Sequence, residues 1–369
     1  MKVTLLTSNL QKKLSFLNHA VSTKSQLPIL LNVLLETVNG KLKVSTTDLE
    51  IGIETLIDCT IEEEGAVTIP SKTFTELINS IPDDTLTLQL KENTLEVVSK
   101  KTRSTFQTSS KEDFPKLYEE KGEKIAILNE DKLHKDFSSV IFAASVDTAR
   151  PALSGVLVRK EAGGFLLVAT DGYRLSLRHY KVEDSVESND QSFIVPARVF
   201  KELLSISDET GAIKMFVSQG SNQIIFEKGQ TTLIGRLIEA DFPDFQKIIP
   251  TDFSVSVAFE REEMQKAVKV CSIFARDAAN IIKLSFAKDQ ITVASQSSSV
   301  GENTVKVDAK LSGEENEIAF NSRYLVDLFA NVEAKEMVFE MTGPLNSGVF
   351  KIKGEESFLH LIMPIRVQG

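Results

Sequence analysis

The sequence has few of the residues that build covalent or metal-linked frameworks. Its 369 residues include two cysteines and four histidines. Cys59 and Cys271 lie far apart with no CxxC spacing, which argues against a disulfide framework or a zinc cage and fits a reducing compartment. The histidines are scattered, without the regular spacing that metal ligands need. We therefore expect neither a metal nor a cofactor.

Long apolar runs and catalytic signatures are also missing. No stretch approaches the ~18 apolar residues of a membrane span, and the apolar run after Met1 is too short for the core of a signal peptide. The sequence lacks GxxxxGK[ST], HExxH and GxSxG patterns. We therefore expect a soluble, cytoplasmic protein that is not an enzyme.

Basic residues are outnumbered by acidic ones. Lysine and arginine total 42 against 52 aspartate and glutamate, for a net charge of -10. Taken alone, this balance argues against a nucleic-acid partner, because phosphates attract basic surfaces. A DNA partner would require that the basic residues be gathered on one surface.

The strongest positive feature is a sequence segment that occurs three times. A short β-like run, then Pro or Asn, one basic residue and an amphipathic helix occurs around Pro70, Pro196 and Asn321, at nearly equal spacing. A second helix start precedes each of these segments, at residues 8–17, 129–137 and 260–268. Shared order and spacing predict a triplicated domain.

Shorter motifs repeat with the same period. Thr47-Asp48-Leu49-Glu50 matches Thr170-Asp171-Gly172-Tyr173, and Ser295-Gln296-Ser297-Ser298 stands at this point of the third copy. Asp113-Phe114-Pro115 and Asp241-Phe242-Pro243 close the first two copies. Each copy then reads as strand, helix, several strands, helix, several strands, which predicts an α+β domain with two helices on one face of an antiparallel sheet. We expect domains at 1–122, 123–250 and 251–369.

Sheet edges and helix charges together suggest an assembly. Exposed strand edges invite pairing with another chain, and a head-to-tail homodimer would close the free ends into a six-domain ring. On the first helix, Leu10, Leu14 and Leu17 share an apolar face, with Lys12 away from it. If such basic residues lined the hole and acidic residues the outside, the net charge would no longer exclude DNA.

Motifs along the whole chain resemble the bacterial DNA sliding clamp family, the β subunit of DNA polymerase III. The resemblance rests on Leu27-Pro28-Ile29-Leu30, Arg150-Pro151-Ala152-Leu153-Ser154-Gly155-Val156, Ala169-Thr170-Asp171-Gly172-Tyr173-Arg174-Leu175, Phe242-Pro243-Asp244-Phe245 and Met363-Pro364-Ile365-Arg366-Val367. It implies a non-catalytic processivity factor of DNA replication that encircles double-stranded DNA without reading its sequence. It also implies three kinds of partner: a second copy, a clamp loader, and the polymerase α subunit with other proteins that carry a clamp-binding motif.

The resemblance implies a cleft between the second and third domains, where partners insert a short peptide with a Gln and apolar residues. Apolar side chains would anchor the peptide, and Arg and Asn would orient its backbone. The residues carried over are Leu153, Thr170, Gly172, Tyr173, Arg174, Leu175, Pro243, Lys247, Ile248, Asn321, Tyr324, Leu345, Ser347, Leu361, Ile362, Met363, Pro364, Ile365 and Arg366.

The resemblance also implies DNA contacts and a subunit interface. The DNA contacts would be Lys12, Lys24, Lys72, Arg150, Arg198 and Lys201, which should meet phosphates because a sliding ring must not read bases. At the interface, Ile273 and Phe274 of one chain would lie near the edge strand of the other, which includes Arg103, Thr105, Phe106 and Thr108.

Four residues depart from the family pattern. Tyr173 stands where many clamps have His, and Lys24 where an Arg is frequent, which keeps the charge but loses the bidentate fork. Gln368 and Gly369 extend the chain past the usual end of the family.

Two rival interpretations stay open at this point. One is a phosphotransferase or hydrolase that uses Asp48 and Asp171, although the third copy has no Asp at the matching position. The other is a protein scaffold with no DNA role. The enzyme predicts metal-dependent turnover, and the scaffold predicts no dependence on DNA topology.

Overall fold

The computed structural model describes residues 1–22, 26–182, 191–206, 209, 211–277 and 279–366. The chain forms two compact units. Unit one contains Met1–Glu130 and Arg198–Leu237, and unit two contains Asp131–Ala197 and the chain from Ile238 onward. Every sheet lies within one of these units.

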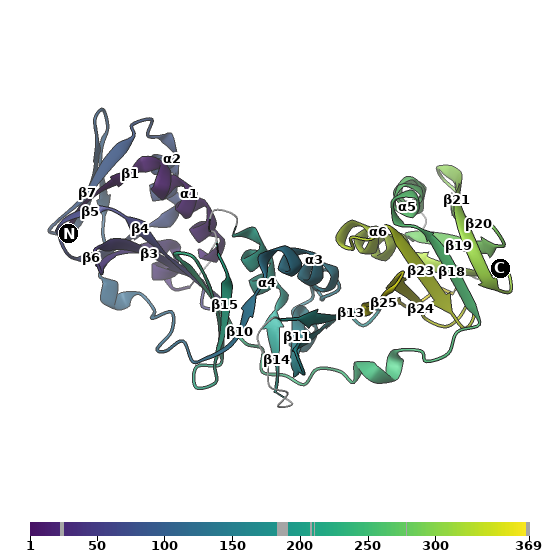
Figure 1. Cartoon of the computed structure of the whole chain (residues 1–369). Coiled ribbons are helices and arrows are strands. Elements are labelled where there is room, and N and C mark those ends of the chain that lie inside the picture. Colours follow the sequence, from purple (N-terminus) through teal and green to yellow (C-terminus); the bar gives the residue numbers. More distant parts are fainter. Residues whose placement is uncertain (23–25, 183–190, 207–208, 210, 278, 367–369) are drawn as a thin grey trace. The chain divides into compact units, whose positions relative to one another are not determined.

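The first sequence repeat lies wholly in unit one (Figure 1). Its elements follow the predicted order of strand, helix, strands, helix, strands. They are β1 (Lys2–Leu6), α1 (Thr7–Leu17), β2 (Asn32–Val38), β3 (Lys41–Thr47), β4 (Ile51–Asp58), β5 (Thr60–Glu63), β6 (Ala66–Pro70), α2 (Ser71–Ser80), β7 (Thr85–Lys91), β8 (Thr94–Ser99) and β9 (Arg103–Gln107).

The second repeat has the same order but is divided between the units. Its β10, β15, β16, β17 and nearly all of α4 belong to unit one, whereas β11 to β14 and nearly all of α3 belong to unit two. The elements are β10 (Glu123–Leu128), α3 (Glu130–Ile141), β11 (Gly155–Glu161), β12 (Gly164–Thr170), β13 (Arg174–Lys181), β14 (Ser192–Pro196), α4 (Ala197–Ser205), β15 (Ile213–Ser218), β16 (Gln223–Lys228) and β17 (Thr231–Arg236).

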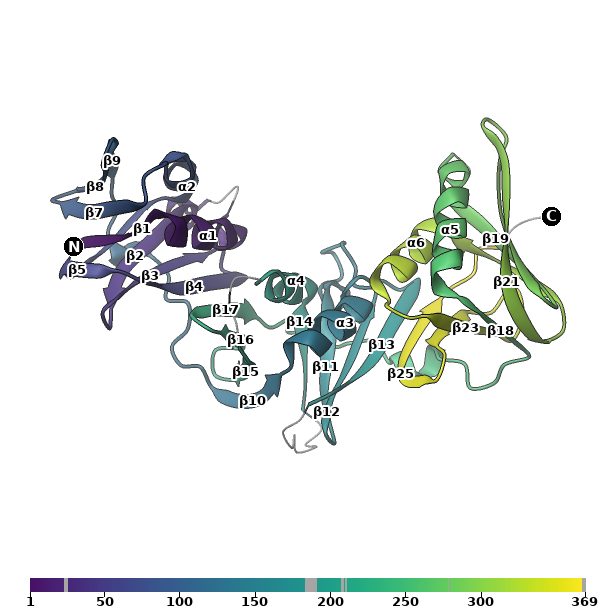
Figure 2. The same cartoon turned by 45° about the horizontal axis from the view of Figure 1, so that its top comes forward.

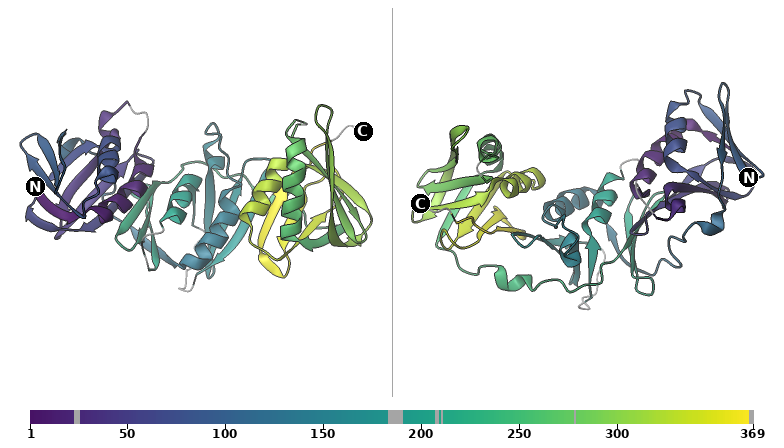
Figure 3. Two further views of the ribbon diagram at one scale, coloured as in Figure 1. Left: turned by 90° about the horizontal axis from the view of Figure 1, so that it is seen from above. Right: turned by 180° about the vertical axis from the view of Figure 1, so that it is seen from behind.

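The third repeat lies wholly in unit two, and its helices α5 and α6 run side by side (Figure 3). Its long β21 pairs with β20 along its first half and with β18 along its second half. The elements are β18 (Val255–Glu260), α5 (Arg261–Ala275), β19 (Ile281–Ala287), β20 (Gln290–Ser297), β21 (Gly301–Gly313), β22 (Asn316–Asn321), α6 (Ser322–Asn331), β23 (Glu336–Met341), β24 (Gly348–Ile352) and β25 (Glu355–Ile362).

The predicted helices are confirmed, with the expected faces buried. Leu10, Leu14 and Leu17 of α1 are fully buried at helical spacing, while Lys12 is exposed. The Asn321 side chain caps α6 by accepting the Arg323 backbone N–H at 3.0 Å.

Sheets run across the boundaries between repeats, as the edge argument predicted. In unit one, β17 of repeat two pairs with β4 of repeat one inside an eight-stranded sheet. In unit two, β13 of repeat two pairs with β25 of repeat three inside a twelve-stranded sheet. Strand β9 ends the five-stranded sheet β5-β1-β7-β8-β9, and among the described residues only β8 pairs with it (Figure 2).

Phenylalanine fills the core of the third repeat. The rings of Phe339 and Phe350 lie 4.8 Å apart, and those of Phe286 and Phe339 are stacked at 5.0 Å. Both cysteines are free thiols, and Cys271 is buried in this core. No helix in the described ranges combines the length and apolar character of a membrane span.

Candidate partner-binding junction and basic helices

The junction of repeats two and three is extended by the C-terminal segment. Beyond the β13–β25 pairing, the backbone N–H of Met363 donates to the Tyr173 carbonyl at 2.9 Å. Two residues later the N–H of Ile365 donates to the Ala319 carbonyl at 2.8 Å. The segment after β25 is therefore bound to both repeats.

The turn between β12 and β13 is held by its own side chains. Asp171 Oδ1 accepts the backbone N–H groups of Tyr173 at 2.9 Å and Arg174 at 3.0 Å. Thr170 Oγ1 accepts the Gly172 N–H at 3.0 Å. Gly172 has φ +91°, a left-handed conformation that glycine adopts without steric cost. The turn is therefore fixed before any partner arrives.

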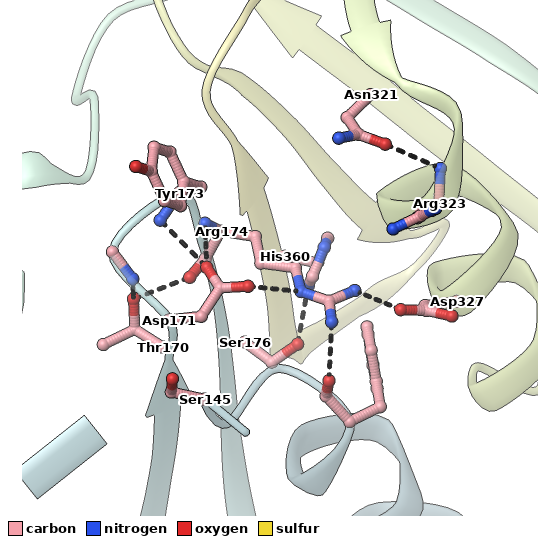
Figure 4. A network of polar contacts seen from close by, with 12 residues as sticks. Ser145, Thr170, Asp171, Tyr173, Arg174, Ser176, Asn321, Arg323, Asp327 and His360 are labelled. Carbon is pink, nitrogen blue, oxygen red and sulfur yellow. Dashed lines mark hydrogen bonds and ion pairs between the residues drawn. The ribbon is translucent and has the colours of Figure 1, made fainter. Parts of the chain in front are cut away.

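Arg174 fastens this turn to the third repeat (Figure 4). Its Nε donates to Asp171 Oδ2 at 3.1 Å, and its Nη1 donates to Asp327 Oδ2 at 2.7 Å. Its Nη2 donates to the Phe142 carbonyl at 2.9 Å, and the guanidinium lies 4.7 Å from the Tyr324 ring centre. The side chain is 8% exposed. Three of its N–H donors are therefore already engaged by the protein, and the placement of Arg174 in the peptide cleft stays a prediction.

A buried histidine lies beneath the same junction. His360 Nδ1 and the Ser176 hydroxyl share a 2.6 Å hydrogen bond between β25 and β13, and the imidazole packs 5.1 Å from the Phe142 ring (Figure 4). Burial, reinforced by the charge of Arg174, holds the pKa of His360 well below its usual value. The imidazole is therefore neutral at the junction.

A second buried arginine, Arg178, lies at the other end of the β13–β25 pairing. Arg178 forms ion pairs with Asp136 of α3 and, at 2.7 Å, with Glu355 at the start of β25. Burial raises the pKa of Asp136 against the opposing charge of Arg178. The two arginines thus fasten repeat two to repeat three at both ends of the β13–β25 pairing.

Four of the predicted cleft residues expose large apolar side chains. Tyr173 is 62% exposed, Leu345 63%, Ile248 48% and Met363 46%. They come from four different segments of unit two. Large exposed apolar side chains that form a contiguous patch are typical of protein-binding surfaces, and these four are the candidates for one.

Four predicted apolar cleft residues are instead part of the core. Leu153, Leu175, Leu361 and Ile362 are each at most 7% exposed. They present little surface to a partner. Thr170 is buried as well, at 5% exposure. The other predicted cleft residues are at least partly exposed: Gly172, Pro243, Lys247, Asn321, Tyr324, Ser347, Pro364, Ile365 and Arg366.

Arg150 belongs to this junction by position, although it was predicted to contact DNA. Its Nη1 lies 3.8 Å from the point that a Cβ on Gly172 would occupy. The side chain is exposed beside the 170–173 turn. Sequence reasoning missed this because Arg150 lies about 20 residues from the turn that it faces.

The predicted DNA contacts differ in how free their charges are. Lys12, Lys72 and Lys201 are exposed on α1, α2 and α4, with no ion pair to another described residue. Arg198 instead donates to Asp48 Oδ2 and to the His19 carbonyl, each at 2.6 Å, which reduces what it can offer a phosphate. Lys24 lies outside the described residues.

Exposed cations occur on the other three helices too. Lys132 lies on α3, Lys266 and Lys269 on α5, and Arg323 on α6. The prediction had not included these four residues. The signal was available, because each stands off the apolar stripe of its helix.

The predicted interface residues lie in two elements, the C-terminal end of α5 and the edge strand β9. Ile273 is 55% exposed in the last turn of α5, and Arg103 and Thr105 are exposed on β9. Phe106 points the other way, since it is 9% exposed and its ring packs edge-on against Phe74 at 5.8 Å. Phe106 therefore contributes to the core of repeat one, and its place at the subunit interface stays a prediction.

The two carboxylates that the enzyme interpretation would use, Asp48 and Asp171, already bind other groups of the protein. Asp48 and Asp171 each accept two backbone N–H groups of their turn, and each also binds an arginine, Arg198 and Arg174 respectively. Within the described ranges no group of three His, Cys, Asp or Glu residues is arranged to hold a metal. The observed geometry is that of a capped turn.

Family models match nearly the whole chain. The N-terminal domain of the DNA polymerase III beta subunit matches residues 1–118, the central domain 127–244 and the C-terminal domain 246–366. The three domains occur in order and without overlap, as the triplication predicted.

Individual relatives agree with the family models. The chain is 28% identical to the beta sliding clamp of Chlamydia muridarum, over 100% of this chain and 99% of that one. It is 29% identical to the beta sliding clamp of Staphylococcus aureus, over 94% of both. Its fold matches the DNA polymerase sliding clamp of Bacillus subtilis with a TM-score of 0.94, at 24% identity and full coverage of both chains. A TM-score of 0.91 relates it to the Pseudomonas aeruginosa beta subunit, at the same identity and coverage.

Proposed function

Because the chain belongs to the family of the DNA polymerase III beta subunit, we propose that it is a sliding clamp. It encircles duplex DNA and tethers the replicative polymerase, which raises processivity. It has no catalytic role of its own. The observation that carries this proposal is the match of all three family domains, in order, to the three repeats of the chain.

The repeat structure supports closure of the ring by a second copy. In repeats one and two, β4 and β13 each pair with the last strand of the following repeat. The corresponding strand of repeat three is the first half of β21, and the corresponding last strand of repeat one is β9. We propose that β9 of one protomer pairs with β21 of the other, at both ends of a head-to-tail homodimer.

The two observed junctions also predict the register of that pairing. Gly235 pairs with Ile51 in unit one, and Ile362 pairs with Arg174 in unit two. Transferred to the free edges, this register sets Thr105 opposite Glu302 of the second copy. It brings Arg103 opposite Thr304.

Exposed cations on all six helices support the DNA contact. We propose that Lys12, Lys72 and Lys201 meet phosphates, joined by Lys132, Lys266, Lys269 and Arg323. Lys24 remains a proposed contact from the sequence alone, and Arg198 would act mainly through its bond to Asp48. Phosphate contacts of this kind bind without sequence preference and weaken as salt rises.

We propose that partner peptides bind at the junction of repeats two and three. Tyr173, Ile248, Leu345 and Met363 supply exposed apolar surface, and Arg150 adds a charge at the rim. The proposed occupants are clamp-binding motifs of the polymerase α subunit, the clamp loader and other replication proteins. The proposed site of action is the cytoplasm, and the proposed domains remain 1–122, 123–250 and 251–369.

A primer-extension assay tests the function. With a clamp loader, ATP and the replicative polymerase, the protein should lengthen products on primed circular DNA. Leu345→Asp should abolish this effect while the dimer persists, because a charge enters the apolar surface. Glu314→Gln, an exposed change elsewhere in unit two and outside β21, is the matched control. Product lengths that do not respond to the protein would contradict the proposal.

A further inference from the structure

We call the junction of repeats two and three, where partner peptides are proposed to bind, the partner junction. The junction of repeats one and two has the same arrangement of backbone hydrogen bonds and strand pairs, a shared backbone frame. The Arg236 N–H donates to the Glu50 carbonyl at 2.9 Å, as the Met363 N–H does to Tyr173. The corresponding strands, β4 with β17 and β13 with β25, pair in the same register. Position 236 therefore corresponds to 363, and position 50 to 173.

The turn that borders this frame is also the same. Asp48 Oδ1 accepts the Ile51 N–H at 2.8 Å, and Thr47 Oγ1 accepts the Leu49 N–H at 3.0 Å. Asp171 and Thr170 make the matching bonds in the partner junction.

A pocket of about 260 Å³ opens within this frame. Its wall consists of the 47–52 turn, the linker Pro115–Leu117, and Ser221, Gln223, Ile234 and Arg236. All of these residues belong to unit one. The volume is just below the range of ligand pockets, about 300–1,000 Å³, and suits one or two side chains of a peptide.

The side chains around the pocket differ from those of the partner junction. Leu49 stands at the position of Gly172, and Arg236 at that of Met363. Arg236 is exposed and forms no ion pair with another described residue, whereas the nearby Glu50 carboxylate lies 3.9 Å from Arg198. The pocket thus places an available guanidinium within reach of the exposed Leu49 side chain, on a wall that is otherwise of mixed polarity.

Two local features of this pocket lower the stability of the folded chain. Leu49 has φ +76°, a left-handed conformation that is unfavourable for leucine, and its side chain is 50% exposed. Gln223 Nε2 donates to the Leu117 carbonyl at 2.8 Å, but its buried Oε1 has no donor among the described residues. Strained backbone and unsatisfied buried groups gather at binding sites.

We propose that this pocket is a second peptide site, which binds an extended segment with a carboxylate side chain beside an apolar one. The carboxylate pairs with Arg236, and the apolar side chain packs against Leu49. The proposal rests on the proposed function, because the frame is interpreted through the partner junction. The changed side chains give it a different specificity, for acidic peptides.

Calorimetry with two peptides tests this site apart from the first. Probe A is Ac-Ala-Glu-Leu-Glu-Leu-Phe-NH2, and probe B is the same peptide with Gln for each Glu. Both are titrated into the full-length dimer carrying Leu345→Asp, which disables the partner junction. We expect probe A to bind this variant and to bind about fivefold more weakly after Arg236→Met. Lys214→Met, which removes an exposed cation outside the pocket, should leave its affinity unchanged.

Leu49→Gly separates binding from folding. Glycine relieves the left-handed strain, so Tm should not fall, while affinity for probe A should drop because the apolar wall is lost. No binding of probe A to the Leu345→Asp dimer, or an affinity indifferent to both Arg236→Met and Leu49→Gly, would overturn the second site. Failure of the partner junction is a separate result, since it appears as unchanged binding of probe B when Leu345→Asp is compared with the wild type.

Discussion

The contacts of a few single side chains, Arg174 above all, hold repeats two and three together at their junction. Arg174 was identifiable from its motif, but its role was not, because Phe142 and Asp327 are distant in sequence and only folding brings them to its guanidinium. The same limit applies to Arg150 and Arg198, whose neighbours across the fold set their roles. Residue type and spacing thus predicted which segments form the site. They did not predict which donors and acceptors already have hydrogen-bond partners within the protein.

Replacing Arg174 with lysine should loosen the junction. Lysine keeps the charge but cannot hold Asp171, Asp327 and the Phe142 carbonyl at once. We expect a loss of about 2 kcal/mol, below the full cost of breaking a buried ion pair, and a Tm lower by about 4–8 °C. Arg276→Lys, on an exposed arginine, is the control. A melting curve identical to that of the wild type would show that the network does not hold the junction.

His360 should make unit two sensitive to acid. Its folded pKa is lowered, so only the unfolded chain gains this proton as pH falls below the ordinary value of about 6.5. The stability from the neutral imidazole is therefore present above that pH and is lost below it, by at most about 1.4 kcal/mol per pH unit. Between pH 7.5 and 5.5, Tm should fall more in the wild type than in His360→Leu. Equal slopes would refute this, and exposed His134→Leu serves as the control.

Helices and strands were the most predictable elements. All six helices lie where the repeated motifs put them, because their apolar spacing and starting residues are local signals. The pairing of strands between repeats followed from the edge argument. The sequence did not predict that repeat two would be divided between two units, because this division depends on which sheet each strand joins. Nor did sequence alone indicate that β25 would be interior to a sheet.

Cysteine pairs can test the proposed strand register. In a Cys59→Ser background, where Cys271 is buried, Thr105→Cys with Glu302→Cys should form a disulfide between protomers under mild oxidation. Directly opposed residues bring Cβ atoms within bonding range. Thr105→Cys with Lys306→Cys, four residues out of register, should not cross-link. Non-reducing gels distinguish the two, and cross-linking by the second pair alone would disprove the register.

For the whole molecule, the distribution of charge matters more than its sum. A net charge of -10 argued against DNA, yet each helix exposes at least one cation. Composition could not reveal this, because it counts charges without placing them on elements. The repeats predicted the architecture, and the family match supports what repetition alone cannot indicate, the proposed enclosure of DNA.

Retention on DNA of different topology tests the ring most directly. Loaded protein is separated from free protein by gel filtration on nicked circular DNA and on the same DNA made linear. A ring that binds without gripping bases should remain on the circle and slide off the linear ends. Equal retention on both forms would contradict encirclement and would favour a scaffold or an ordinary DNA-binding protein.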